Sequence, residues 1–216
     1  MSVKPYLASL ALASSMLAGP ANAAVTMSFN STGSSPTTGF TVIDTFTTLA
    51  GLAITGSVQI KTPPADPSGA PPANSSPSGT SYLSVLAGGA ATYTFASPVN
   101  GVQFDWGSVD TYNTLTLRGS FGTMTIVPGT TPNPTFPSTN GNQGFTGSGL
   151  FTALGNGDTF TSITFGSSSN SFEVDNLAVR SAVPEPASWA MMLAGFGLVG
   201  FGLRHRTARV RRLTYA

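Results

Sequence analysis

Four carboxylic acids in two short segments are the side chains of this sequence best suited to chemistry. Asp105 and Asp110 fall in one segment, and Glu173 and Asp175 fall in the other. Hard cations such as Ca²⁺ take several oxygen ligands. If the two segments are neighbours in the fold, these four acids are candidate Ca²⁺ ligands.

The same residues have other interpretations. Asn113 and Asn176 could add amide oxygens to a metal site, but they could equally form turn and cap hydrogen bonds, as Asp110 could. Asp105 and Glu173 could also act as the acid and base of a glycosidase. A carboxylate on a strand is more often surface charge, so we expect no catalytic function and no required cofactor, with Ca²⁺ left open.

Aromatic residues offer a second kind of site. Trp106 and Tyr112, with Tyr82 and Tyr93, could stack on sugar rings if a β-sheet presents them beside Asp and Asn side chains. The alternative for Trp106 is core packing, because a large ring on a strand contributes most when it is buried. We therefore treat Trp106 and Tyr112 as candidate glycan contacts with a structural alternative.

Composition excludes several classes of site. The 216 residues contain no cysteine, and the only histidine is His205. Thiol chemistry, a Ser-His-Asp triad in the main body and multi-histidine metal sites are therefore ruled out. Between residues 24 and 183 there are seven acids and three bases, a net charge of about −4, which argues against a nucleic-acid partner.

The N-terminus has the pattern of a secretory signal peptide. Lys4 precedes an apolar run over residues 6–18, and Ala21 and Ala23 form an A-x-A cleavage site. We expect signal peptidase to remove residues 1–23 and the remainder to be exported.

The C-terminus combines an apolar segment with a basic one. Residues 187–203 carry no charge, and Arg204 and Arg206 begin a cluster of five arginines. This pattern predicts a transmembrane helix over 187–203, stopped by the arginines, with 204–216 as a cytoplasmic tail. The protein would then pass through a transient single-pass state in the inner membrane.

Pro184-Glu185-Pro186 and Trp189-Ala190 stand directly before this apolar segment. Together with the basic cluster they resemble the PEP-CTERM sorting tail of Gram-negative bacteria, over residues 184–206. The resemblance implies recognition by an exosortase, removal of the tail near the Pro-Glu-Pro motif, and delivery to the cell surface beside exopolysaccharide and biofilm components.

The body predicts an all-β domain over residues 24–183. Short segments rich in Thr, Val, Phe and Ile alternate with Gly, Asn, Pro and Ser, which favours a single jelly-roll-like β-sandwich. Residues 61–80 contain six prolines and predict a long exposed loop. The expected strands are 25–29, 41–46, 52–60, 81–86, 91–95, 99–106, 113–118, 121–127, 144–152, 159–165 and 171–179.

A second resemblance covers the middle of the body. The run from Trp106 to Asn113, W-G-S-x-D-x-Y-N, is similar to the core of exosortase-dependent surface proteins. The resemblance implies a β-sandwich with no assigned reaction. We therefore expect a non-catalytic structural or adhesive protein of the exopolysaccharide layer. The alternatives are a carbohydrate-binding module, with or without Ca²⁺, and a glycan-active enzyme.

Overall fold

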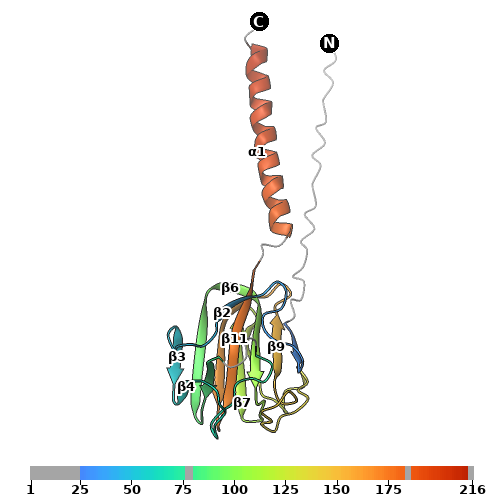
Figure 1. The fold of residues 1–216 in the computed structure, drawn as a ribbon. Helices are drawn as coiled ribbons and strands as arrows, with labels where there is room; N and C mark the ends of the chain where they lie inside the picture. Colours follow the sequence, from blue (N-terminus) through green and yellow to red (C-terminus); the bar gives the residue numbers. More distant parts are fainter. Residues whose placement is uncertain (1–24, 76–79, 183–185, 214–216) are drawn as a thin grey trace.

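The computed structural model describes residues 25–75, 80–182 and 186–213. Within them the chain forms eleven strands and one helix, and every strand pair is antiparallel (Figure 1). The expected signal peptide and its cleavage site, Ala21 and Ala23, lie outside the described residues.

A single long strand, β6 (Gly89–Gly107), connects two halves of the sheet. Its first part pairs with β3 (Leu52–Thr55) and β10 (Phe160–Ser167), and its last part pairs with β9 (Gly149–Leu154) and β11 (Phe172–Ser181). Pro98 lies between the two parts and has no N–H to donate to a neighbouring strand. The sheet therefore changes partners there.

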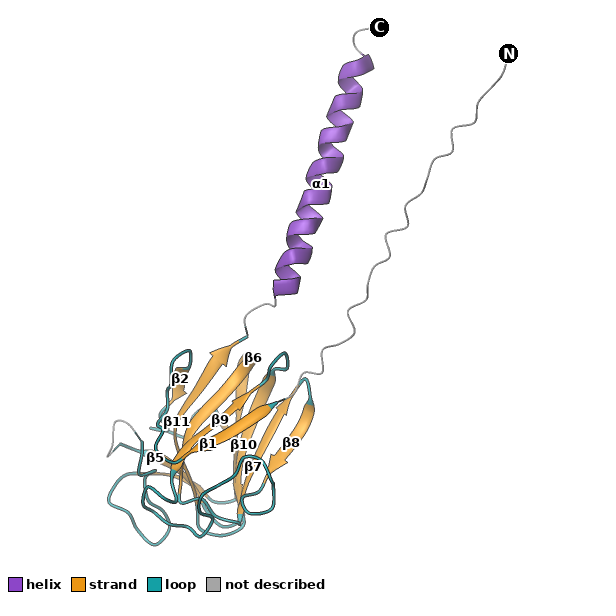
Figure 2. Ribbon diagram, turned by 90° about the vertical axis from the view of Figure 1, so that its right-hand side faces the viewer, coloured by secondary structure: helices purple, strands orange, loops and turns teal. Residues whose placement is uncertain are grey.

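The first half, here called sheet one, contains β11, the last part of β6, and β9. The flanking strands are β1 (Thr26–Asn30), β2 (Thr41–Asp44), β4 (Val58–Lys61) and β5 (Tyr82–Val85). The second half, sheet two, contains β3, the first part of β6, β10, β7 (Asn113–Gly119) and β8 (Gly122–Ile126). The two sheets stack as a β-sandwich (Figure 2), which confirms the predicted fold class.

The core between the sheets is rich in aromatic rings. Phe104 of sheet one meets Phe165 of sheet two edge-on, with ring centroids 5.1 Å apart. Trp106 stacks on Phe172 at 4.4 Å. All four side chains are fully buried, and rings of this size supply much of the hydrophobic stabilisation of a small core.

The Pro-rich segment differs from its prediction. We expected residues 61–80 to form an exposed loop, but Gly69, Ala70, Pro72 and Ser75 are buried in the described part of it, residues 61–75. They are buried because the segment lies against the outer surface of sheet one: the position of a Cβ on Gly107 would be 3.0 Å from Pro72.

The C-terminal helix α1 (Pro186–Leu213) contains the whole uncharged segment that we expected to cross a membrane. However, no helix in the described part of the chain is both long enough and apolar enough to span a bilayer. The expectation of a transmembrane helix over 187–203 is therefore not supported. The segment covers about 26 Å as a helix, at the short end for a span, and four of its residues are glycine.

Candidate functional site

The outer face of sheet one carries three carboxylates under a cover of loops. Asp175 of β11 is paired with Asp105 of β6, and Glu173 is paired with Gly107. Side chains two residues apart on a strand share a face, so the three acids lie together. Two segments cover them: the first covering loop, residues 31–40, and the second covering loop, residues 62–75. Each acid is at most 1% exposed.

Asp105 holds both covering loops. Its Oδ1 accepts a hydrogen bond from the backbone N of Ser35 at 2.8 Å, and Nδ2 of Asn74 lies 3.4 Å from the same oxygen. Its Oδ2 accepts from Nδ2 of Asn176 at 2.9 Å. One carboxylate on the sheet therefore joins two segments that are far apart in sequence.

Gln103 fixes the first covering loop at a second point. Its Oε1 accepts from the backbone N of Thr37 at 2.8 Å, and its Nε2 donates to the hydroxyls of Thr37 and Thr152, both at 3.0 Å. Gln103 is 1% exposed. Sequence reasoning missed this residue, because nothing in the strand around Gln103 indicates that a distant loop lies against it.

Asp175 and Asn176 hold the end of the second covering loop. The hydroxyl of Ser75 donates to Oδ2 of Asp175, and Nδ2 of Asn176 contacts the same hydroxyl at 3.1 Å. The backbone N of Asn176 donates to Oδ1 of Asp175 at 2.7 Å. Asn176 has a φ of 49°, in the left-handed region that Asn tolerates better than most residues. The asparagine therefore suits the β-bulge at this point of β11.

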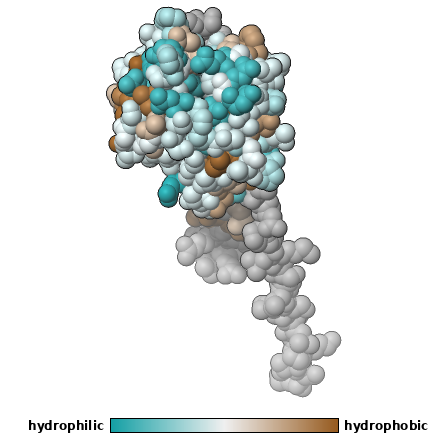
Figure 3. Space-filling model, turned by 90° about the horizontal axis from the view of Figure 1, so that it is seen from below, coloured by the Kyte–Doolittle hydropathy of each residue, from teal (hydrophilic) through white to brown (hydrophobic). Residues whose placement is uncertain are grey.

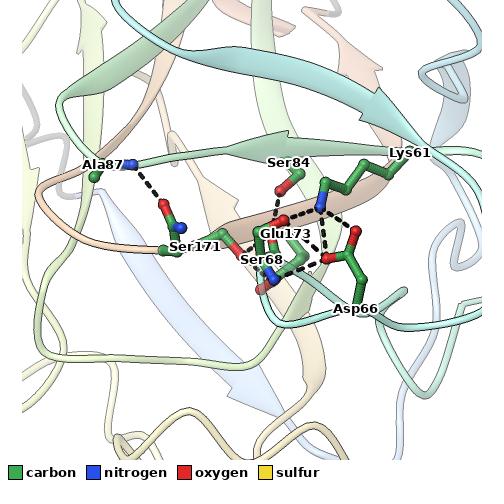
Figure 4. A network of polar contacts seen from close by, with 8 residues as sticks. Lys61, Asp66, Ser68, Ser84, Ala87, Ser171 and Glu173 are labelled. Carbon is green, nitrogen blue, oxygen red and sulfur yellow. Dashed lines mark hydrogen bonds and ion pairs between the residues drawn. The ribbon is translucent and has the colours of Figure 1, made fainter.

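Glu173 anchors the middle of the second covering loop (Figure 4). Its Oε1 accepts from the hydroxyl of Ser171, whose Oγ also lies 2.9 Å from the backbone oxygen of Ser68. The backbone N–H of Ala70 also bonds the carboxyl group. Its Oε2 is buried and has no hydrogen-bond partner among the described residues.

The loop around Glu173 contains the only ion pair among the described residues. Nζ of Lys61 lies 2.7 Å from Oδ1 of Asp66, and Lys61 also bonds the hydroxyl of Ser68. The hydrogen bond from Lys61 is the main cause that lowers the pKa of Asp66 to about 2. Because Lys61 pairs with the exposed Asp66, it does not pair with a buried acid. Asp105, Glu173 and Asp175 therefore have no ion-pair partner in the described part of the chain.

Burial without such a partner shifts the acids toward their neutral form. Desolvation raises the pKa of Asp105 to about 7, against the lowering effect of its hydrogen bonds from Asn176 and Ser35. Desolvation likewise raises the pKa of Glu173 to about 7, and it raises that of Asp175. Such groups can hold loops in place, and in the described part of the chain the covering loops leave Asp105 and Glu173 at most 1% exposed.

The expected set of four Ca²⁺ ligands does not assemble. Asp110 lies apart from the other three, in a turn where a Cβ on Gly141 would be 2.7 Å from its Oδ2. Within residues 25–75, 80–182 and 186–213, no three His, Cys, Asp or Glu side chains gather as a group that could hold a metal ion. The three acids that do share a face, Asp105, Glu173 and Asp175, instead accept hydrogen bonds from other side chains and from the covering loops.

Asn113 acts as a structural connector at the other end of this region. It is fully buried; its Oδ1 accepts from the backbone N of Asp110 at 3.0 Å, and its Nδ2 donates to the backbone oxygen of Ser171 at 3.1 Å. The turn-and-cap interpretation of the asparagines is therefore the one that the geometry supports for Asn113.

Replacing Asn113 with alanine is expected to lower the free energy of unfolding by about 2–3 kcal/mol, because it leaves a buried donor and a buried acceptor unpaired. Urea denaturation followed by tryptophan fluorescence would measure the change. The matched control is Asn140→Ala, at an exposed position, which we expect to cost less than about 0.5 kcal/mol. Equal effects of the two changes would contradict the connector role.

The structure separates the aromatic candidates. Trp106 is fully buried, so its assignment as a glycan contact is wrong. Tyr82 is 1% exposed. Tyr112 is partly exposed, and its hydroxyl donates to the backbone oxygen of Asn170 at 2.6 Å. Tyr93 is also partly exposed and, with Phe95, lines an open groove of about 230 Å³.

This groove was not predicted from sequence. Besides residues of β6, its lining includes Ile43 of β2 and Val179 of β11, which are distant in the chain. No local pattern indicates that these strands flank Tyr93, so only the sheet topology could have revealed the groove.

The sorting motif lies at the start of α1. Pro186 is its first residue, and Trp189 is 56% exposed. Ala190 and Arg204 are also exposed on the helix, and Arg206 lies within its bounds. Pro184 and Glu185 fall outside the described residues. Seen from the end opposite α1, patches of hydrophilic side chains lie among residues of intermediate hydropathy (Figure 3).

Comparison with known proteins identifies the tail. The sequence profile of the PEP-CTERM protein-sorting motif matches residues 182–206. No curated protein matches the chain.

Three solved structures are similar to the chain at low identity. Two are of the family 11 carbohydrate-binding module of Clostridium thermocellum. The module from cellulase Lic26A-Cel5E is 12% identical with a TM-score of 0.34, covering 70% of this chain and 99% of the module. The module in complex with a β-1,3-1,4-mixed-linked tetrasaccharide is 11% identical with a TM-score of 0.36, covering 69% and 100%. The catalytic unit of a GH87 α-1,3-glucanase from Streptomyces thermodiastaticus is 14% identical with a TM-score of 0.35, covering 69% of this chain and 28% of the enzyme.

Proposed function

From the PEP-CTERM protein-sorting motif that the chain carries, we propose that it is an exported protein which an exosortase delivers to the cell surface, where its β-sandwich has a structural or adhesive role in the exopolysaccharide layer. The single observation that carries this proposal is the motif at residues 182–206. The motif implies export and sorting. The role of the domain after sorting is our inference.

Two features of the domain support a non-catalytic role. Asp105 and Glu173, the candidate glycosidase pair, are buried and bonded to the covering loops. Both are also shifted toward neutrality at pH 7 by burial, with pKa values of about 7. We propose that these acids keep the loops on the sheet, and that the protein needs no cofactor.

The position of the motif suits recognition by a processing enzyme. It immediately follows β11, the strand that pairs with β6 along the middle of sheet one. Prolines disfavour helix in the residue before them, so the sequence Pro184-Glu185-Pro186 predicts an extended backbone at the motif. Glu185 places a charge between them. We propose that this segment is what the exosortase reads.

The intact mass of the protein from the surface fraction of its native host tests the proposal. We expect a mass that lacks residues 1–23 and everything beyond the Pro-Glu-Pro region. Changing Glu185 to alanine is expected to leave the tail attached, because it removes the charged group from the motif. Ser181→Ala, just outside the matched residues, is the control and should be processed normally. A wild-type mass that includes residues 187–216 would overturn the sorting proposal.

A further inference from the structure

The outer face of sheet two carries aligned threonines. Thr92 of β6 is opposite Thr164 of β10, which is opposite Thr116 of β7, which is opposite Thr125 of β8. Adjacent strands lie about 4.8 Å apart, so this row of four threonines extends about 14 Å across the sheet. A hydrogen bond of 2.8 Å between the Thr92 and Thr164 hydroxyls shows that these two side chains share a face.

A second row runs beside the first. It lies two residues away from the first row on each strand, a distance of about 6.7 Å. Paired across the strands from β6 to β8, its members are Thr94, Ser162, Arg118 and Thr123. We call the eight positions of the two rows the threonine face. The residues between them in sequence, including Leu117 and Ile163, point into the core, so the threonine face points outward, with Ser162 as a member that is only 9% exposed.

The chemistry of this surface differs from that of a protein-docking surface. The buried centres of protein interfaces are enriched in aromatic residues, Met and Arg, whereas seven of these eight positions are Thr or Ser. A hydroxyl both donates and accepts hydrogen bonds, as sugar hydroxyls do, and each threonine methyl offers a small apolar contact. Regular rows suit a polymer whose groups repeat at regular steps.

Arg118 supplies the only charge on the threonine face. It is exposed, and its guanidinium has no hydrogen-bond or ion-pair partner among the residues that the structure describes. Guanidinium pairs strongly with carboxylate groups, often through two parallel hydrogen bonds. The body as a whole is acidic, which makes an unpaired cation on its surface unusual. Because Arg118 is surrounded by hydroxyl groups, the threonine face favours a ligand that carries both hydroxyls and a negative charge.

We propose that the threonine face binds an acidic polysaccharide, whose hydroxyls bond the two rows and whose carboxylate pairs with Arg118. This inference rests on the proposed role in the exopolysaccharide layer and gives that role a surface and a ligand class. It assigns no role to the buried acids of sheet one.

Affinity electrophoresis in alginate, with neutral dextran as the comparison polymer, tests the inference. The full chain is used with its five C-terminal arginines changed to glutamine, so that the tail does not bind alginate by charge. We expect alginate to retard this protein and dextran to retard it at least tenfold less. Arg118→Gln, and the triple change Thr92→Val, Thr116→Val and Thr164→Val, are each expected to raise the dissociation constant for alginate at least tenfold.

The controls are chosen to isolate the threonine face. Thr→Val keeps side-chain shape and strand propensity, and thermal unfolding of each variant verifies its fold. Thr135→Val, at an exposed loop position, and Arg180→Gln, which removes a cation on β11, should leave binding within twofold. No retardation by alginate, or unchanged binding by the two test variants, would overturn the inference. So would a dimer in sedimentation that Thr116→Glu dissociates, because the face would then bind a second copy.

The two proposals can fail separately. A processed mass in the surface fraction, combined with no alginate binding, leaves sorting in place and removes the threonine face as a polysaccharide site. Alginate binding by an unprocessed protein has the opposite meaning: it leaves the binding site in place and removes exosortase sorting.

Discussion

Replacing Trp106 with alanine is expected to lower the free energy of unfolding by about 3–5 kcal/mol, the usual cost of removing a large buried ring. Trp106 is fully buried, stacks on Phe172 at 4.4 Å, and meets Phe136 edge-on at 5.2 Å. The cavity left by the indole cannot be filled without moving both phenylalanines. Urea denaturation followed by circular dichroism measures the change.

The control for this prediction is Phe145→Ala. Phe145 is 65% exposed, so removing its ring should change stability by less than about 0.5 kcal/mol. If Trp106→Ala costs no more than Phe145→Ala, then Trp106 does not pack in the core and its assignment as a glycan contact would have to be considered again.

The strands were predictable because their patterns are local. Alternation in residues 113–118 and 159–165 gave β7 and β10 nearly at their observed bounds. The joining of residues 91–95 and 99–106 into the single strand β6 was not predictable, because Pro98 has the appearance of a turn residue. The expected strand over 52–60 is divided into β3 and β4 around Gly56, which has a φ of 64° and so favours a turn.

The environment of the acids was not predictable for a different reason. The sequence shows that Asp105, Glu173 and Asp175 lie on strands, but which strands pair depends on the whole topology. Their burial depends further on residues 31–40 and 62–75 lying across sheet one, and nothing in those Ser- and Pro-rich segments indicates which face they cover. The threonine face likewise depends on which strands pair and in which register. No single strand's sequence indicates that its threonines lie beside those of other strands.

Covering a sheet face with loops rather than with a third layer has an energetic consequence. Burying a carboxylate without an ion-pair partner disfavours its charged form. The covering loops are therefore most stable when Asp105, Glu173 and Asp175 are neutral, and ionisation of these acids opposes the closed arrangement. The stability of this domain should consequently depend on pH in a direction opposite to that of a protein whose acids are ion-paired.

Glu173→Gln is expected to stabilise the protein at pH 8 and to leave it nearly unchanged at pH 4. Burial raises the pKa of Glu173 from its ordinary value of 4.5 to about 7. Between those values the unfolded chain is ionised while the folded one is not, so stability falls by about 1.4 kcal/mol per pH unit and is constant above pH 7. Glutamine is neutral at every pH. The Glu173→Gln variant therefore does not lose the roughly 3 kcal/mol of unfolding free energy that the wild type loses as the pH rises.

Glutamine also fits the site. Oε1 of Glu173 accepts the hydrogen bond from Ser171, and Oε2 has no hydrogen-bond partner in the described part of the chain, so a glutamine whose amide oxygen takes the place of Oε1 keeps the bond from Ser171. Urea denaturation between pH 4 and pH 9 measures the effect. We expect the wild-type curve to fall with rising pH and the Glu173→Gln curve to fall less steeply, because Asp105 still titrates.

Asp66→Asn is the matched control, because it lies in the same covering loop and has the opposite electrostatics. Its hydrogen bond from Lys61 lowers the pKa of Asp66 to about 2, so its contribution is present above pH 4 and is lost as the pH falls through 2. The asparagine variant should therefore be no more stable than the wild type at pH 8. If Glu173→Gln is likewise no more stable there, then Glu173 is solvated or paired in solution, and the second covering loop does not seal sheet one. If instead Glu173→Gln raises the free energy of unfolding at pH 8 and Asp66→Asn lowers it, then burial of an acid, and not the number of acids, determines its effect on stability.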